Sequence, residues 1–257
     1  MRVEPAGHAH ARAWSEHARF AIYYAPPRAS AWWQAGCAWL GRDPEDGTAL
    51  TPPQPAALAR RVEALTLAPR RYGWHATLVA PFALRTGVTP DGLVAAATRW
   101  ARDCAPFCVA VDIAALGSFV ALRPATKHGD AKLRALAASA LHAFAPLRRP
   151  PSDAEREKRR AAPLSARQRA LLDAWGYPYV LDEYRFHMTL SDSLADPAER
   201  DALIDWWRAA AAPLGPLPVD HAALFVEPEP GAPFVLYKRV PFGGQPEPAA
   251  SRDETQA

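Results

Sequence analysis

Cysteine is scarce in this sequence, and it has none of the long apolar runs that export or membrane insertion requires. The cysteines Cys37, Cys104 and Cys108 are odd in number and lack disulfide or zinc spacing, which favours reduced thiols in a cytoplasmic protein. No uninterrupted run of about 18 apolar residues occurs. The first residues lack the apolar segment typical of signal peptides. We therefore expect neither secretion nor a membrane partner.

A strong charge of either sign is also missing. The formal net charge is +3, which is compatible with a small anionic ligand but does not predict long nucleic acid as a partner. Apolar residues make up 49% and charged residues 22%, as is usual for a folded domain. We expect one monomeric unit over residues 19–242, between disordered tails at 1–18 and 243–257.

The chain contains an internal repeat. The segment 72–78 reads YGWHATL, and the segment 184–190 reads YRFHMTL. A second pair, VDIAAL at 111–116 and VDHAAL at 219–224, follows in the same order at nearly the same separation. Two matched pairs at similar spacing indicate a duplicated unit.

The predicted secondary structure repeats too, because a helix and two strands follow each histidine segment. Helices are predicted over 29–40, 90–104, 130–144 and 196–212, and strands over 20–25, 107–115, 118–122, 217–226 and 234–239. The capping-box pairs Ser152/Glu155 and Ser165/Gln168 predict two short helices in an insertion at 147–178. We expect a first lobe at about 19–126 and a second at about 127–242.

The two histidine segments place the same chemistry on one face of a strand. Side chains alternate along a strand, so His75 shares a face with Thr77, and His187 shares one with Thr189 and Arg185. If the duplicated halves pack around a twofold axis, the imidazoles meet across a cleft. Tyr72, Tyr184 and Tyr24 are further candidates to line that cleft.

A phosphodiester suits such a pair, because its cleavage needs one base and one acid. Imidazoles with a pKa near 6.5 supply both near neutral pH, one neutral and one protonated. Thr77, Thr189 and Arg185 are the expected phosphate-binding groups. No third ligand stands at metal-binding spacing beside either histidine, so we expect no metal and no cofactor.

These residues resemble the two-histidine (2H) phosphoesterase superfamily, which carries paired His-x-Thr/Ser segments. The stretches that look like its branch associated with bacterial phosphonate-metabolism operons are 70–78, 167–172, 175–180 and 182–190. The resemblance implies a bilobal, duplicated α+β fold, with two antiparallel sheets around a central cleft and helices outside. It also implies that His75 and His187 are catalytic and that Thr77 and Thr189 bind phosphate.

Three functions remain open on this basis. The leading hypothesis is metal-independent hydrolysis of a small cyclic phosphodiester, such as a cyclic ribose phosphate of phosphonate metabolism. The second is an RNA-end cyclic phosphodiesterase or 2′,5′-RNA ligase-like enzyme. The third is a non-catalytic regulatory protein that binds a phosphometabolite.

Overall fold

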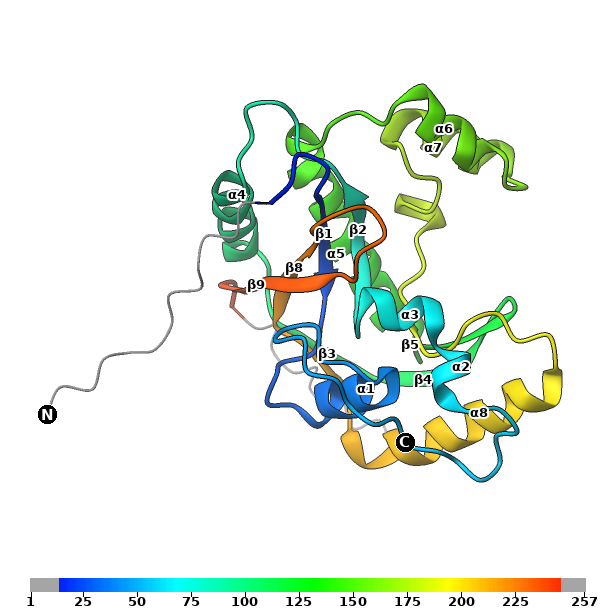
Figure 1. Ribbon diagram of the computed structural model, residues 1–257. Coiled ribbons are helices and arrows are strands. Elements are labelled where there is room, and N and C mark those ends of the chain that lie inside the picture. The colour runs from blue at the N-terminus through cyan, green and yellow to red at the C-terminus, as the bar shows by residue number, and fades with distance from the viewer. Residues whose placement is uncertain (1–13, 246–257) are drawn as a thin grey trace, which may run out of the picture.

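The fold is built around one large antiparallel sheet, seen in a computed structural model that describes residues 14–245 (Figure 1). The strands of this sheet lie in the order β4-β5-β6-β2-β1-β8-β9, and β3 and β7 form a second, two-stranded sheet. The strands are β1 (Arg19–Tyr24), β2 (Ala76–Phe82), β3 (Phe107–Val109), β4 (Val111–Leu116), β5 (Phe119–Pro124), β6 (Met188–Thr189), β7 (Leu217–Val219), β8 (His221–Glu227) and β9 (Val235–Pro241). The predicted mixed α+β architecture with two antiparallel sheets is confirmed.

Helices surround this sheet. They are α1 (Ala31–Leu40), α2 (Val62–Leu65), α3 (Leu67–Tyr72), α4 (Pro90–Arg102), α5 (Lys127–Phe144), α6 (Asp153–Arg160), α7 (Ala166–Trp175) and α8 (Pro197–Ala211), with short 3-10 turns at Ala145–Leu147, Leu181–Glu183 and Ala212–Leu214. Helix α5 packs against β2, α4 against β9, and α8 against β4 and β5, while α6 and α7 stand as a pair at one corner (Figure 1). No helix within residues 14–245 is long and apolar enough to cross a bilayer.

Local signals predicted the helix starts well. The Thr89 side chain accepts from the Gly92 amide at the start of α4, whose first residue is a proline. Both predicted capping boxes are present, at Ser152 for α6 and at Ser165 for α7. The two short helices expected in the insertion are therefore confirmed.

The sheets are not divided between the repeats in the expected way. Strands β2 and β6, which follow the two histidines, hydrogen-bond to each other with Ala76 opposite Met188. Strands β4 and β5 continue the sheet beyond β6, and β8 and β9 continue it beyond β1. Because β2 and β6 pair directly, one sheet runs through both predicted lobes, and the lobes do not have a separate sheet each. The duplication and the lobe boundary near residue 127 stay predictions.

The chain ends differ in part from the expected tails. Trp14 packs edge-on against Tyr237 with ring centroids 5.6 Å apart, and the Ser15 hydroxyl donates to the Pro228 carbonyl. Residues 14–18 are thus held against the folded domain, although a tail was predicted up to residue 18. At the other end, where a tail was predicted from residue 243, the Gly243 and Gly244 amides donate to the Ala101 and Cys104 carbonyls, each over 2.9 Å. The remaining parts of the predicted tails, 1–13 and 246–257, lie outside the described residues.

Tryptophans fill the core beside the histidine strands. The Trp39 indole in α1 donates to the Leu190 carbonyl over 2.7 Å, which ties this helix to the chain just after β6. Gly36, on the same helix, lies against the buried Trp74 ring, where a Cβ would sit only 2.2 Å from a ring carbon. Only glycine therefore allows α1 to approach the residue that precedes His75 so closely.

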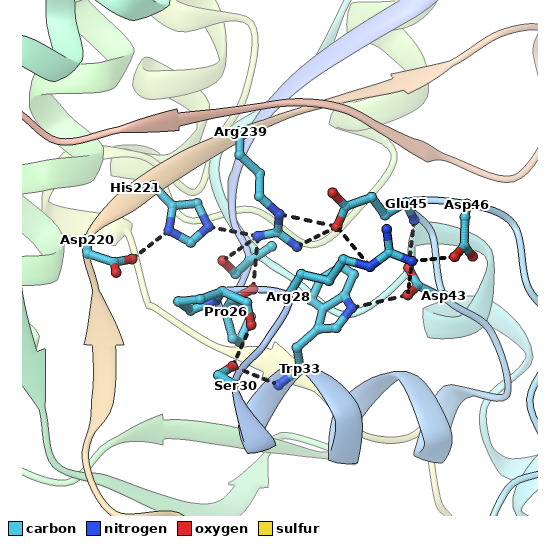
Figure 2. Close-up of polar contacts among 12 residues, drawn as sticks. Pro26, Arg28, Ser30, Trp33, Asp43, Glu45, Asp46, Asp220, His221 and Arg239 are labelled. Carbon is cyan, nitrogen blue, oxygen red and sulfur yellow. Dashed lines mark hydrogen bonds and ion pairs between the residues drawn. The ribbon is translucent and has the colours of Figure 1, made fainter. Parts of the chain in front are cut away.

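A polar network joins β8, β9 and the loop after α1 (Figure 2). The Arg239 guanidinium donates to His221 Nε2 over 2.7 Å and to Glu45 over 3.1 Å, and it lies 4.5 Å from the Trp33 ring. Because a guanidinium cannot accept a hydrogen bond, His221 Nε2 must accept, and Nδ1 donates to Asp220 over 2.5 Å. His221 is therefore a structural histidine on β8.

Candidate functional site

His75 lies just before β2, and contacts on two sides hold its ring. Its Nδ1 donates to the Gly73 carbonyl over 2.8 Å, and the Tyr23 ring stacks on it at 3.9 Å between centroids. Since a carbonyl only accepts, Nδ1 carries the proton and Nε2 of the neutral ring is an acceptor. Nε2 lies 3.4 Å from the Thr77 hydroxyl. The ring is half-buried and keeps contact with solvent.

His187 repeats this arrangement just before β6. Its Nδ1 donates to the carbonyl of Arg185, also two residues earlier and also over 2.8 Å. The half-buried ring lies 5.7 Å from the Phe119 ring at the start of β5. The local backbone therefore sets the same tautomer on both histidines, and each presents a basic Nε2.

The strand register brings the two segments together. With Ala76 opposite Met188 in an antiparallel pair, His75 falls opposite Thr189, and Thr77 falls opposite His187. All four side chains share one face of the sheet. The two histidines occupy diagonal positions, for which strand geometry places the Cα atoms roughly 7–8 Å apart. The two segments lie far apart in the sequence, and the β2–β6 pairing brings them side by side.

Two adjacent hollows receive these side chains. His187 and Thr77 line a cavity of about 430 Å³, whereas His75 and Thr189 line one of about 290 Å³. Phe119 lines both, so the two hollows adjoin. The single central cleft stays a prediction.

The other predicted side chains have different surroundings. Arg185 is exposed and lines the larger cavity, and the buried Tyr184 lines it too, donating its hydroxyl to the Thr77 carbonyl over 2.9 Å. Tyr72 lines the smaller cavity. Tyr24 lines neither cavity, so its prediction is wrong: the side chain is fully buried and donates to the Pro218 carbonyl over 2.6 Å.

Several contributors were missed by sequence reasoning. Tyr23 supports the His75 ring from the neighbouring strand, and Phe119 lines both cavities. Asp192, at the rim of the smaller cavity, accepts from the Leu67 and Ala68 amides over 2.8 and 3.0 Å and so positions the start of α3. These contacts join distant segments, and no local pattern signals them.

Burial shifts both histidines toward the neutral form. Burial is the main reason why the pKa of His75 falls to about 4; the Gly73 hydrogen bond opposes this shift, and the neighbouring His187 contributes to it. Burial also lowers the pKa of His187, helped by the Arg123 charge. Both imidazoles are therefore neutral at neutral pH without a bound ligand. This corrects the expectation of one neutral and one protonated ring.

The low pKa of His75 predicts a pH-dependent stability. A histidine with a folded pKa near 4 and an unfolded pKa near 6.5 stabilises the fold fully above pH 6.5, and this contribution is lost as pH falls toward 4. Over that window the free energy of unfolding should drop by about 1.4 kcal/mol per pH unit from this residue. Urea unfolding of wild type and His75→Gln at pH 7, 6 and 5 measures the difference. Parallel pH profiles for the two proteins would contradict the assignment.

Within the described part of the chain, no group of three or more histidine, cysteine, aspartate or glutamate side chains is arranged to hold a metal ion.

Comparison with known proteins identifies relatives. Residues 77–235 match the family described as "Protein of unknown function (DUF1045)". Over 243 residues the chain is 39% identical to the ribose 1,5-bisphosphate phosphokinase PhnN of Janthinobacterium sp. (strain Marseille), covering 90% of this chain and 52% of the relative. Over 231 residues it is 42% identical to the protein of the same name from Laribacter hongkongensis (strain HLHK9), covering 86% and 51%. The chain thus spans about half the length of these relatives.

These names contradict the expected reaction. A phosphokinase transfers a phosphoryl group to its substrate, whereas the expected enzyme was a hydrolase that opens a cyclic phosphodiester with water. The prediction of a cyclic phosphodiesterase is therefore wrong. The relatives' names also give no support to RNA-end processing or to a non-catalytic regulator. A small phosphorylated ribose compound is common to the expected function and to the relatives' names.

Proposed function

The chain belongs to the DUF1045 family, and we propose that it binds the ribose phosphate on which a phosphoryl transfer takes place. One observation carries this proposal: two imidazoles of the same tautomer and two threonine hydroxyls share one face of paired strands, beside solvent-accessible cavities. The relatives' names supply the substrate class, a ribose bisphosphate.

The phosphate would bind between the two Nε2 atoms and the threonine hydroxyls. A neutral Nε2 is an acceptor and cannot donate to a phosphate oxygen, so binding requires that a ring takes up a proton. The phosphate charge favours this, since an anion nearby raises a histidine pKa. Arg185, on the rim of the larger cavity, adds a permanent positive charge. Binding and protonation are therefore linked.

His75 and His187 remain our proposed catalytic pair, now for phosphoryl transfer. As the accepting oxygen of the ribose compound bonds to the incoming phosphorus, its proton passes to a neutral Nε2. The bridging P–O bond of the donor breaks, and its electron pair stays on the donor's leaving oxygen. A protonated second ring would stabilise the charge on the transferred group.

The phosphoryl donor is proposed to bind outside this chain's cavities. None of the lysines, Lys127, Lys132, Lys158 and Lys238, follows a glycine, so the sequence has no Gly-x-x-x-x-Gly-Lys-Ser/Thr loop for a nucleoside triphosphate. The relatives are about twice as long as the matched region, and their additional half is the proposed place for the donor.

We further propose that the fold is a divergent 2H phosphoesterase-like unit, duplicated and bilobal, that works as a monomer in the cytoplasm without a cofactor. The matched carbonyl bonds of His75 and His187 and the pairing of β3 with β7, which occupy equivalent places in the two repeats, support a duplication.

Calorimetric titration with ribose 1,5-bisphosphate tests the proposed function. We expect saturable binding at pH 7.5 with net uptake of protons, measured by comparing buffers of different ionisation enthalpy. For each proton taken up, affinity should fall about tenfold per pH unit as pH rises. Unphosphorylated ribose is the control and should not bind. Absence of binding, or binding without proton uptake, would reject the proposal.

A further inference from the structure

A cluster of arginines lies beside the larger cavity, where the end of β2 approaches α6. Arg19, Arg148, Arg149 and Arg159 line a small hollow of about 30 Å³, together with a single carboxylate, Glu155. We call this site the arginine hollow. Ala80 and Tyr177 line both the arginine hollow and the larger cavity, so the two spaces adjoin.

The backbone fixes two of these arginines in place. The Arg149 amide donates to the Ala83 carbonyl over 2.8 Å, and Arg148 forms a β-bridge with Leu84. The chain that follows α5 is therefore attached to the continuation of β2, the strand of Thr77. Figure 1 shows α6 and α7 at this corner of the molecule.

The guanidinium groups of Arg148 and Arg159 are incompletely paired. Arg148 donates from Nη2 to the Trp175 carbonyl over 2.8 Å, but its buried Nε has no hydrogen-bond partner among residues 14–245. Arg159 makes no side-chain hydrogen bond or ion pair within the same residues. An unpaired buried donor is unfavourable, so these groups are suited to an acceptor from outside the chain.

The charges in the arginine hollow are also unbalanced. Burial lowers the pKa of Arg148, and the like charge of Arg159 lowers it further. Glu155 is the one carboxylate among the residues that line the hollow, and its charge is shared between Arg149, 3.9 Å away, and Arg159. A bound anion would relieve the repulsion.

We propose that the arginine hollow binds the second phosphate of a ribose bisphosphate whose first phosphate lies at His75 and His187. The inference rests on the proposed function. The hollow is far smaller than the few hundred cubic ångströms that a whole ligand usually occupies, so it suits one end of a ligand that extends from the adjoining cavity. From Thr77 to Ala80 the strand rises roughly 10 Å, a span that a five-carbon sugar with a phosphate at each end can bridge.

Calorimetric titration of three ligands against two variants tests this proposal. The ligands are ribose 1,5-bisphosphate, ribose 5-phosphate and inorganic phosphate. Arg159→Ala removes one guanidinium from the hollow, whereas Lys158→Ala removes an exposed positive charge from the same helix outside it. We expect Arg159→Ala to weaken binding of the bisphosphate by about tenfold or more, while leaving ribose 5-phosphate unchanged. Lys158→Ala should change neither, and thermal melting verifies that both variants fold.

Each other outcome has a distinct meaning. If wild type does not bind the bisphosphate, the proposed function fails and this inference fails with it. If wild type binds it but Arg159→Ala has no effect, or weakens both sugars equally, only the arginine hollow is rejected. If inorganic phosphate binds in an Arg159-dependent way and the bisphosphate has no advantage over ribose 5-phosphate, the hollow takes a separate ion and the inference is overturned.

Discussion

Alanine at His75 or at His187 is expected to weaken ribose 1,5-bisphosphate binding by about 10- to 100-fold. The ring that takes up a proton would supply a charge-assisted hydrogen bond from its Nε2, worth about 1.5–3 kcal/mol, and either ring can be the one that takes it up. Each variant should also reduce the proton uptake on binding, because one titrating group is gone. Calorimetry at pH 7.5 in two buffers measures both quantities. His128→Ala, which changes an exposed histidine on α5, is the matched control and should bind like wild type.

Glutamine variants distinguish the contribution of the proton to binding from that of the side chain's shape. His75→Gln and His187→Gln keep a hydrogen-bonding group near the same place but cannot titrate near neutral pH. We expect them to retain more affinity than the alanine variants, with the same reduction in proton uptake. Full proton uptake in either glutamine variant would show that another group binds the proton, and would remove that histidine from the site.

Alanine at Glu227 is expected to lower the free energy of unfolding by about 3–5 kcal/mol. The Glu227 side chain is fully buried at the end of β8, where it accepts from Arg19, from Arg71 and, over 3.0 Å, from the Gly231 amide. Removing the carboxylate leaves both guanidinium groups without their partner. Arg19 and Arg71 are about one-third exposed and can partly rehydrate, so the loss should fall at the lower end of the range. Urea unfolding at pH 7 measures it.

Two further variants define the cause of this loss. Glu227→Gln keeps the shape and one acceptor but removes the charge, so we expect it to destabilise the protein less than alanine does. Asp182→Ala breaks an ion pair with Arg167 in which both side chains are more than half exposed, so it should destabilise the protein far less than Glu227→Ala does. A loss of similar size for Glu227→Ala and Asp182→Ala would show that burial of the first carboxylate does not matter.

Much of the local structure was readable from short stretches of the chain. Thr89, Ser152 and Ser165 begin helices because a hydroxyl satisfies an amide only two or three residues away. The apolar stripe of the helix at 127–144 predicted its buried face, since Leu133, Leu136 and Phe144 recur at helical spacing and all are buried. Strand alternation likewise placed each histidine on the same face as its threonine.

The reaction was not readable in the same way. The paired histidines and threonines are groups that can bind and protonate a phosphate. Both hydrolysis and phosphoryl transfer use such groups. Whether water or a sugar phosphate accepts the phosphoryl group depends on what else the ligand contacts. The comparison with the phosphokinase relatives corrected this point.

The sequence by itself was enough to predict a feature wherever the interaction that forms it reaches only a few residues along the chain. The helix caps and the paired histidine segments are such features. Tertiary packing alone decided that Tyr24 lies in the core, that Phe119 lines both cavities of the site, and that Arg148 and Arg159 gather beside it. The physical reason is that these outcomes depend on which strands pair and which helices cover them. Such pairing joins segments far apart in the chain, and neither partner carries a local signal of the other.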